Sequence, residues 1–296
     1  MFVKRLISGI VLLVLIITLF AFGGCILAAG LLLISLIAYV ELSKVFDKND
    51  GKWKPCASDL IGLTTIVAYY VVTYLVYKPT PRGDGKLIMP DMTYVLLIAG
   101  VLMLAQMIIY VKRFPELDAD RIAHSIFSFF YAPFMLSFIY FLRETGEHSH
   151  LVWIVLICSW GCDTCAYCVG VLIGKHRVFP KLSPKKTMEG CIGGIVGAAI
   201  IGALYGYFYV SRFNPVNFAG LNGRPGTAIV LSLICGVGSI AGMIGDLAAS
   251  GIKRNKGIKD YGTLIPGHGG IMDRFDSITV AAPIVYILSY LIIFGV

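Results

Sequence analysis

The chain has 296 residues, of which 57% are hydrophobic and only 14% are charged. Soluble globular domains carry about 25% charged residues, so this composition excludes a soluble two-domain enzyme and indicates a protein solvated by the lipid bilayer. The 25 Lys and Arg residues outnumber the 17 Asp and Glu residues, which gives a formal net charge of +8. In a soluble protein this excess would suggest a nucleic-acid partner. Here the basic residues are expected in loops beside the membrane, and we predict no nucleic-acid partner.

Nine apolar segments are long enough, or nearly so, to cross a bilayer, because a helix needs about 20 residues to span a hydrocarbon core of about 30 Å. In chain order they cover residues 6–22, 25–40, 60–77, 92–111, 125–142, 151–174, 191–211, 227–246 and 277–296. The first two are short and predict a hairpin that turns at Gly23 and Gly24. Lys4 and Arg5 are also typical of a signal peptide. Hydrophobicity resumes after Cys25, however, so we favour an uncleaved hairpin.

The basic residues set the predicted orientation. With the N-terminus inside, most of the 25 Lys and Arg residues fall in cytoplasmic segments, as the positive-inside rule requires. We therefore predict an all-α integral membrane protein, a polytopic bundle of about nine transmembrane helices with its N-terminus in the cytoplasm and its C-terminus outside. Residues 1–150 are generic apolar spans. Residues 151–296 combine spans with charged cytoplasmic loops, so the catalytic residues are expected in this part of the chain.

The eighth span runs directly into polar residues. If the helix continues, Asp246, Ser250 and Lys253 fall at i, i+4 and i+7 on one face, where a carboxylate, a hydroxyl and an ammonium would line one wall of a site. The alternative is a simple exit turn in which Lys253 and Arg254 contact lipid headgroups.

A glycine-rich loop around one histidine follows at residues 266–270. Its glycines would let backbone N–H groups approach phosphate oxygens. Asp273 and Asp276, at i and i+3, could share one helical face and offer hard oxygen ligands to Mg²⁺. Arg274 between them is suited to a phosphate or to a salt bridge. A plain tight turn and solvated carboxylates are the alternatives.

A second basic loop, at residues 174–190, contains Lys185 and Lys186, whose ammonium groups suit a polyphosphate or an anionic lipid. By itself it also fits an ordinary cytoplasmic loop. Upstream, Asp163 lies near the middle of the sixth span, where an ionisable side chain is costly and therefore indicates function. Tyr167 follows at i+4 and is expected on the same face.

The eight cysteines lie mostly in apolar stretches and are interpreted as unpaired packing residues. Cys158, Cys162, Cys165 and Cys168 include C-x₂-C spacings. On a helix they extend over about 15 Å, so they cannot surround one tetrahedral zinc ion. The sequence contains no nucleophile elbow, Walker-type loop or H-E-x-x-H motif.

Two blocks of residues carry a resemblance to a known family. The main block runs Ser250-x-x-Lys253-Arg254-x₄-Lys259-Asp260-x-Gly262-x₃-Pro266-Gly267-His268-Gly269-Gly270-x-x-Asp273-Arg274-x-Asp276. The upstream block comprises Asp163-x-x-Ala166-Tyr167-x-x-Gly170, Gly174-Lys175-His176, Ser183-Pro184-Lys185-Lys186-Thr187 and Glu189-Gly190. Together they resemble the signature of the phosphatidate cytidylyltransferases, also called CDP-diacylglycerol synthases. Only Cys165 departs from this signature, because glycine is common at its position in the family. The match covers residues 160–277, and the first half agrees in hydrophobicity alone.

The resemblance implies an enzyme with CTP and phosphatidic acid as substrates, CDP-diacylglycerol and pyrophosphate as products, and Mg²⁺ as a required cofactor. It also implies that Asp246 and Asp273 coordinate a two-cation centre, in which K⁺ is a candidate for the second, monovalent cation. Ser250 and Lys253 match positions that the family uses at the substrate cavity. The spacing of the two aspartates alone does not show that they meet.

Such a reaction needs no covalent nucleophile, because an oxygen of the lipid phosphate attacks the α-phosphorus of CTP, and the protein supplies alignment and charge neutralisation. The residues expected to hold anionic substrate are Lys253, Arg254, Lys259, Lys185, Lys186 and Arg274. Gly269 and Gly270 are expected to close over phosphate, and Asp163 and Tyr167 to line the substrate site. His268 is expected to act as a hydrogen-bond donor, and Asp276 to act at the reacting groups or to pair with Arg274.

These expectations place a multi-pass protein in the cell membrane with both motif loops facing the cytoplasm, where CTP is available. The bilayer is then a partner, and the resemblance is compatible with a homodimer. One alternative is the same chemistry on an ether-linked lipid phosphate. The other is a secondary transporter of an anionic metabolite, which Asp163 and the glycine-interrupted spans favour and the absence of an internal repeat disfavours.

Overall fold

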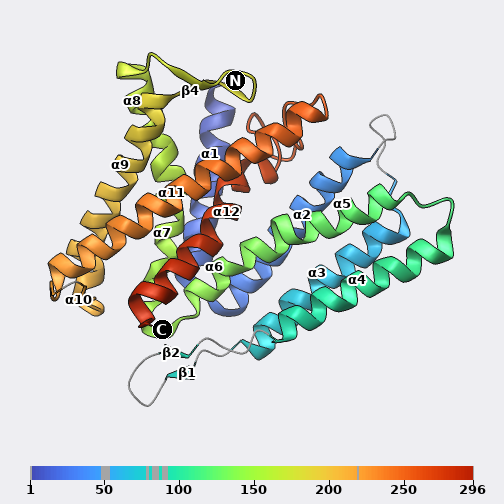
Figure 1. Ribbon diagram of the computed structural model, residues 1–296, viewed down its shortest axis with the longest axis horizontal. Helices are drawn as coiled ribbons and strands as arrows, with labels where there is room; N and C mark the ends of the chain where they lie inside the picture. The colour runs from blue at the N-terminus through green and yellow to red at the C-terminus, as the bar shows by residue number, and fades with distance from the viewer. Residues whose placement is uncertain are drawn as a thin grey trace. The chain divides into compact units, whose positions relative to one another are not determined.

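The computed structural model describes residues 2–47, 54–77, 80–81, 87–88, 93–218 and 220–295, and helices dominate them (Figure 1). The α-helices are α1 (Phe2–Phe22), α2 (Gly24–Phe46), α3 (Ala57–Val76), α4 (Thr93–Arg113), α5 (Ala119–Phe129), α6 (Met135–Arg143), α7 (Val152–Leu156), α8 (Cys162–Ile173), α9 (Met188–Tyr205), α10 (Ser211–Phe213), α11 (Arg224–Asn255) and α12 (Met272–Ser289). Short π or 3₁₀ segments are η1 (Phe130–Phe134), η2 (Gly146–Leu151), η3 (Ile157–Gly161), η4 (Gly206–Val210) and η5 (Tyr290–Gly295). The strands are β1 (Thr80–Pro81), β2 (Leu87–Ile88), β3 (Arg177–Phe179) and β4 (Ser183–Thr187).

The helices match the predicted membrane spans. Within the described part of the chain, 8 helices are long and apolar enough to cross a membrane, and Ile7–Phe22 is a shorter apolar helix. Each coincides with one of the predicted segments, and some are composite, as where α5, η1 and α6 form one span over Ala119–Arg143. The predicted all-α, polytopic membrane architecture is therefore confirmed. Its orientation stays a prediction.

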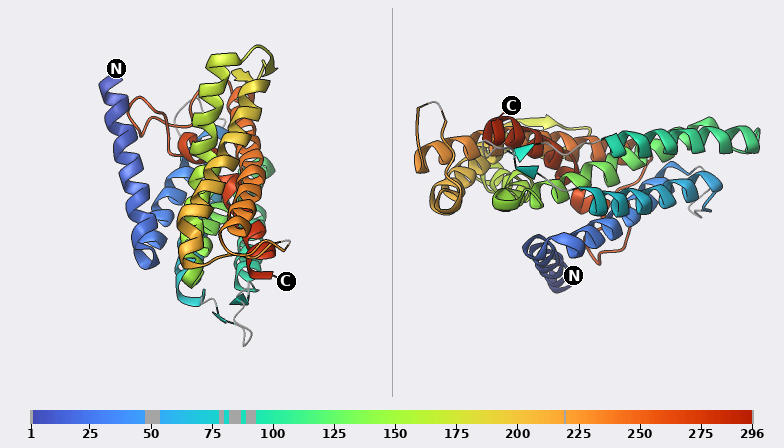
Figure 2. Two further views of the ribbon diagram at one scale, coloured as in Figure 1. Left: turned by 90° about the vertical axis from the view of Figure 1, so that its left-hand side faces the viewer. Right: turned by 90° about the horizontal axis from the view of Figure 1, so that it is seen from below.

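Several helices extend beyond the predicted spans, and α2 and α11 do so at their C-terminal ends. Helix α2 continues to Phe46. Helix α11 covers 32 residues and continues to Asn255, because no proline or left-handed residue follows Asp246 before Gly257, whose φ is 67°. The predicted turn of the N-terminal hairpin is confirmed. The chain changes direction at Gly23, with φ of 64°, between α1 and α2 (Figure 2).

The chain divides into two compact units. Unit 1 comprises residues 1–81, 88–140 and 256–274, and unit 2 comprises residues 82–87, 141–255 and 275–296. The segment 256–274, which holds the glycine-rich loop, thus belongs with α1 to α5 although it follows α11 in the sequence. The sequence-based division into residues 1–150 and 151–296, with the catalytic loops expected in the second part, stays a prediction.

A buried polar network fixes the helices of unit 1. The hydroxyl of Tyr39 (α2), a fully buried residue, lies 2.6 Å from Oγ of Ser125 (α5). The Gln106 side chain (α4) donates to Ser125 Oγ at 2.8 Å and accepts from Ser58 Oγ (α3) at 2.7 Å. Polar groups inside an apolar bundle are costly unless paired, so these bonds specify how α2 to α5 lie side by side (Figure 1).

Glycines bring the helices of unit 2 close together. Small residues recur at every fourth position and are buried: Gly190, Gly194, Ala198, Gly202 and Gly206. A Cβ on Gly194 would lie 2.9 Å from the Cys162 carbonyl oxygen (α8), and one on Gly202 would lie 2.9 Å from the Leu231 carbonyl oxygen (α11). This spacing of small residues lets helix backbones approach closely in a membrane, so α9 packs tightly against both α8 and α11.

Candidate active site

A β-hairpin in unit 2 presents the lysines of the second basic loop. Strands β3 and β4 pair antiparallel, with Arg177 opposite Thr187. The Thr187 side chain caps α9 by accepting from Gly190 N at 3.2 Å. Glu189 in the first turn of α9 accepts from Lys175 N and His176 N, at 3.0 and 3.2 Å, and lies 2.6 Å from His176 Nδ1. The helix start and the hairpin therefore hold β4 in place from both ends.

The hairpin carries Lys186 to the acidic residue of α11. The Lys186 ammonium lies 2.5 Å from Oδ2 of Asp246, and the two side chains are 22% and 25% exposed. Partial burial of both partners makes such an ion pair stronger than one on an open surface. The structure thus joins a residue of the upstream motif block to the acidic residue that lies four positions before the main block.

Further charged residues of unit 2 surround this pair. Asp276 of α12 is buried, its Oδ1 accepts from Ser277 N at 2.8 Å, and it lies within electrostatic range of Asp246, Lys253 and Asp163. A Cβ on Gly245 would lie 2.6 Å from the Asp276 carbonyl oxygen. Only glycine permits this close approach of α11 to α12, which brings the Asp246 and Asp276 backbones together.

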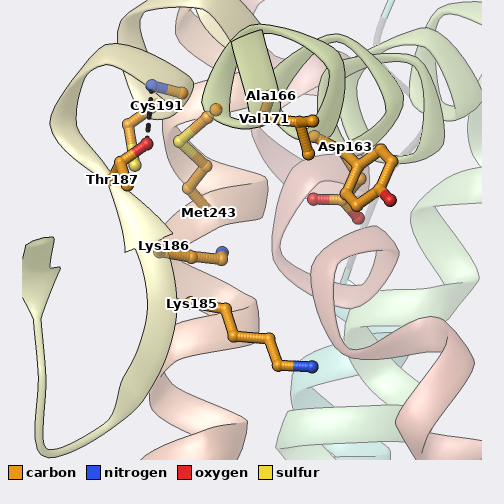
Figure 3. A pocket seen from close by; sticks show the side chains of 11 residues that line it. Asp163, Ala166, Val171, Lys185, Lys186, Thr187, Cys191 and Met243 are labelled. Carbon is orange, nitrogen blue, oxygen red and sulfur yellow. Dashed lines mark hydrogen bonds between the residues drawn. The ribbon is translucent and has the colours of Figure 1, made fainter. Parts of the chain in front are cut away.

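A cavity of about 330 Å³ adjoins the charged cluster. Residues of α8, β4, α9 and α11 line it: Asp163, Ala166, Tyr167, Gly170, Val171, Lys185, Lys186, Thr187, Gly190, Cys191 and Met243. The Lys186 side chain extends from β4 into this space (Figure 3). Asp163 and Tyr167 share the cavity, which confirms that they occupy one face of their helix. The size is that of a small-molecule site.

The electrostatics of Lys186 favour its charged form. Burial of the ammonium by itself lowers the pKa, but the carboxylates of Asp246 and Asp163 outweigh burial and raise the pKa of Lys186 above its usual value. Lys186 therefore carries a positive charge at neutral pH and can act as a fixed cation toward a phosphate.

Helix α11 is continuous through the predicted catalytic stretch. It holds Asp246, Ser250 and Lys253 without a break, so the predicted helical continuation is confirmed and the simple exit turn is wrong. Lys253 is buried, with 9% of its surface exposed, so its side chain is covered by protein. Arg254 and Lys259 are exposed, and their predicted contacts with substrate stay predictions.

The glycine-rich loop of unit 1 is built around Asp273. Its Oδ2 accepts from Tyr261 N at 2.7 Å and from Gly270 N at 2.9 Å. Gly267 and Gly269 have φ of 77° and 86°, in the left-handed region that glycine adopts readily. The loop is therefore a tight turn, and its closure over phosphate stays a prediction for Gly269 and Gly270.

Arg274 and His268 of unit 1 hold the same loop. The Arg274 guanidinium donates to the His268 carbonyl oxygen from Nε at 3.2 Å and from Nη2 at 3.0 Å. His268 Nδ1 lies 2.7 Å from Oγ of Ser8 in α1. Arg274 thus has a structural task that the sequence did not indicate, and the N-terminal helix contacts the motif.

Sequence reasoning missed Glu41 of α2, an acidic residue that is 5% exposed and contacts the backbone at the start of α12. Its only signal was a carboxylate at the end of an apolar run. The second basic loop likewise gave no sign that Glu189 would tie the hairpin to α9, because that contact depends on the turn between β3 and β4.

The charged cluster has the donors that Mg²⁺ prefers. Carboxylate oxygens are hard ligands for Mg²⁺, which usually takes one or two of them together with substrate phosphates, and Asp246 and Asp276 offer such oxygens. Within the described ranges, no group of three or more His, Cys, Asp or Glu side chains is arranged to hold a metal. Asp273 belongs to unit 1 and Asp246 to unit 2, so their shared two-cation centre stays a prediction.

Comparisons with known proteins identify the family of the chain. The cytidylyltransferase family model matches residues 3–292. A protein named phosphatidate cytidylyltransferase from Staphylococcus haemolyticus (strain JCSC1435) is 29% identical over 284 residues, which cover 96% of this chain and 97% of that protein. A protein of the same name from Staphylococcus aureus (strain COL) is 30% identical over 276 residues, covering 92% and 95%. The chain therefore belongs to the cytidylyltransferase family and is a multi-pass membrane nucleotidyltransferase.

Proposed function

We propose that the protein is a phosphatidate cytidylyltransferase. It transfers CMP from CTP to phosphatidic acid and yields CDP-diacylglycerol and pyrophosphate. The observation that carries the proposal is the Lys186–Asp246 ion pair beside Asp276, at the edge of a 330 Å³ cavity. The lipid substrate is proposed from the relatives, which are named phosphatidate cytidylyltransferase.

The chain's own residues act by position and charge. Lys185 and Lys186 line the cavity from β4 and can neutralise the negative charge of a polyphosphate, as preorganised cations do in phosphoryl-transfer enzymes. The attacking group is an oxygen of the lipid phosphate, whose bond to the α-phosphorus of CTP forms as the bond to pyrophosphate breaks. No side chain is needed as a covalent nucleophile, which accords with the absence of a catalytic triad or elbow in the sequence.

A divalent cation completes this proposal. When bound, Mg²⁺ would supply charge neutralisation at the reacting phosphates and the departing pyrophosphate. Asp246, Asp273 and Asp276 are the residues proposed to hold it, and Ser250 and Lys253 lie on α11 beside Asp246 to orient substrate. A K⁺ ion as second cation is part of the same proposal.

The membrane setting suits the two substrates. CTP is soluble, and phosphatidic acid is confined to the bilayer, so the site must be open to both phases. We propose that the protein lies in the cell membrane with the cavity on the cytoplasmic side, because most basic residues fall in the loops assigned to that side. Such an enzyme can act as a homodimer, which stays part of the proposal.

The direct test is transfer of ³²P from α-labelled CTP into a chloroform-soluble product by the purified protein in detergent micelles. The expected result is labelled lipid only when phosphatidic acid and Mg²⁺ are both present. EDTA should abolish transfer and excess Mg²⁺ should restore it. Absence of labelled lipid from a preparation that is folded by circular dichroism and monodisperse would overturn the proposal.

Two further arms separate the alternatives. An ether-linked analogue of phosphatidic acid tests whether the site distinguishes ether-linked from ester-linked lipid chains. Labelled product from the ether lipid but none from phosphatidic acid would assign the same chemistry to a different substrate. Uptake of labelled anionic metabolites into proteoliposomes without any covalent product would instead indicate a transporter.

A further inference from the structure

Glu41 is a buried carboxylate that the reaction outlined above does not use. It lies in α2, within a helix apolar enough to span a membrane, and only 5% of its surface is exposed. An ionised or polar side chain at such a position is costly unless it is fully hydrogen bonded. Its partners therefore indicate why it is there.

Both oxygens of Glu41 accept hydrogen bonds from the start of α12. Ile271 N lies 3.0 Å from Oε1, and Met272 N lies 2.8 Å from Oε2. Backbone N–H groups at a helix start have no acceptor within their own helix, and the positive end of the helix dipole favours a carboxylate there. Glu41 thus satisfies two N–H groups that would otherwise be buried without partners.

Asp273 holds the adjoining backbone from the other direction. Its Oδ2 accepts from Tyr261 N and Gly270 N. Three consecutive N–H groups, those of residues 270, 271 and 272, therefore bind to two carboxylates. The loop that carries the glycine-rich motif is fixed between α2 and its own aspartate.

The glycines of the motif fit this arrangement. A methyl group on Gly262 would lie 2.5 Å from Glu41 Oε1, and one on Gly270 would collide with both carboxylate oxygens. Neither position tolerates a side chain while Glu41 stays in place. Glu41 and residues 260–264 also line a common cavity of about 760 Å³ in unit 1.

We propose that Glu41 is a positioning residue that fixes the backbone of residues 261–272 and thereby sets the orientation of Asp273 and of the glycine-rich loop. It acts through backbone hydrogen bonds and does not touch the reacting groups. The effect on catalysis rests on the proposed function. The anchoring of the loop does not, because it follows from the contacts within unit 1 alone.

Hydrogen–deuterium exchange on the full-length protein in detergent tests the anchor without any assay of activity. In Glu41→Gln the side-chain oxygen can still accept one bond, but the amide NH₂ faces a backbone N–H donor. Exchange of the amides in residues 261–272 is expected to accelerate tenfold or more, while α2, α3 and α5 keep their protection. Unchanged exchange in the loop, or uniformly faster exchange throughout unit 1, would overturn the proposal.

A double-mutant cycle tests the contact itself. Gly262→Ala is expected to accelerate loop exchange in the wild-type background, but to add less than twofold in Glu41→Ala, because the carboxylate that its methyl group displaces is gone. Gly100→Ala in α4 is the matched control, since a Cβ there meets nothing within 4 Å. Additive effects of Gly262→Ala and Glu41→Ala would contradict the assignment.

Kinetics separate this proposal from the proposed function. If the wild type transfers label, Glu41→Gln should lower kcat at least tenfold and raise the Mg²⁺ concentration needed for half-maximal rate, at a temperature where the variant is still fully folded. Full activity of this variant would show that the loop position does not matter for catalysis and would overturn the inference. A wild type without activity would overturn the proposed function only, because the exchange experiments still report on the anchor.

Discussion

The ammonium of Lys186 lies 2.5 Å from Oδ2 of Asp246, although Lys186 ends a short hairpin and Asp246 lies near the far end of a 32-residue helix. This contact joins the upstream motif block to the part of α11 that leads into the main block, within unit 2. It also gives Asp246 a cationic neighbour and places a fixed positive charge at the rim of the cavity.

Loss of the Lys186 charge should impair transfer strongly. Lys186→Met keeps most of the side-chain volume but removes the cation that is proposed to neutralise the phosphates, and it removes the ion pair with Asp246. Removal of one preorganised charge donor typically costs about 10²- to 10³-fold in kcat, and we expect a loss of that order in the labelled-CTP assay. Lys181→Met, at an exposed site in the β3–β4 turn, is the control and should retain wild-type turnover. Equal activity of the two variants would contradict the assignment.

The contribution of this ion pair to stability should be constant over the neutral range. The pKa of Lys186 is raised in the folded protein, so the stabilisation is complete below the ordinary lysine pKa of about 10.4 and is lost only as the pH rises through the higher folded-state value. The difference in unfolding free energy between wild type and Lys186→Met should therefore not change from about pH 7 to 9. A difference that shrinks over this interval would show that Lys186 loses its proton earlier.

Asp246 and Asp273 should each be needed for the metal-dependent step. Asp246→Asn and Asp273→Asn each neutralise a carboxylate that is proposed as a metal ligand, and in the second variant the new amide oxygen can still accept from the loop N–H groups. We expect each to abolish transfer while the protein stays folded in the membrane. A variant that retains about a tenth or more of wild-type turnover at saturating Mg²⁺ would overturn its assignment as a metal ligand.

The glycine contacts of α9 should be sensitive to added volume. In Gly194→Val the new side chain would meet the Cys162 carbonyl oxygen, Ala166 and Met243, and overpacking of this kind costs about 1–3 kcal/mol. We expect a lower unfolding midpoint in detergent micelles. Gly236→Ala in α11 is the control, because its nearest neighbour would be the Ala199 Cβ at 4.0 Å. A midpoint unchanged by Gly194→Val would show that α8 and α9 separate without cost.

The predicted orientation has a direct test in cells. A tag fused to the C-terminus should react with a membrane-impermeant reagent added outside, because an odd number of spans places the two ends on opposite sides. A tag on the N-terminus is the matched control and should react only after permeabilisation. If both tags react only after permeabilisation, both termini lie in the cytoplasm and the number of spans is even, which would contradict the predicted topology.

The helical, membrane-spanning architecture follows from the local composition of the sequence. Each span is an apolar run of sufficient length, and each run forms a helix because every backbone polar group in a bilayer must be paired within its own segment. The face shared by Asp246, Ser250 and Lys253 also follows from helical periodicity, because the helix runs through Gly251 and ends only before the left-handed Gly257. The resemblance of the motif blocks to a known family is likewise a property of order along the chain.

Contacts between distant segments depend on the packed structure. The pairing of Lys186 with Asp246 requires the β3–β4 hairpin, and the proximity of Asp276 to Asp246 requires α11 and α12 to touch at Gly245. Glu41 binds backbone N–H groups some 230 residues away, and backbone donors carry no side-chain signature in a sequence. Periodicity describes one helix at a time, so it identifies the side chains that share a face. Only the packing of helices against one another decides which faces meet.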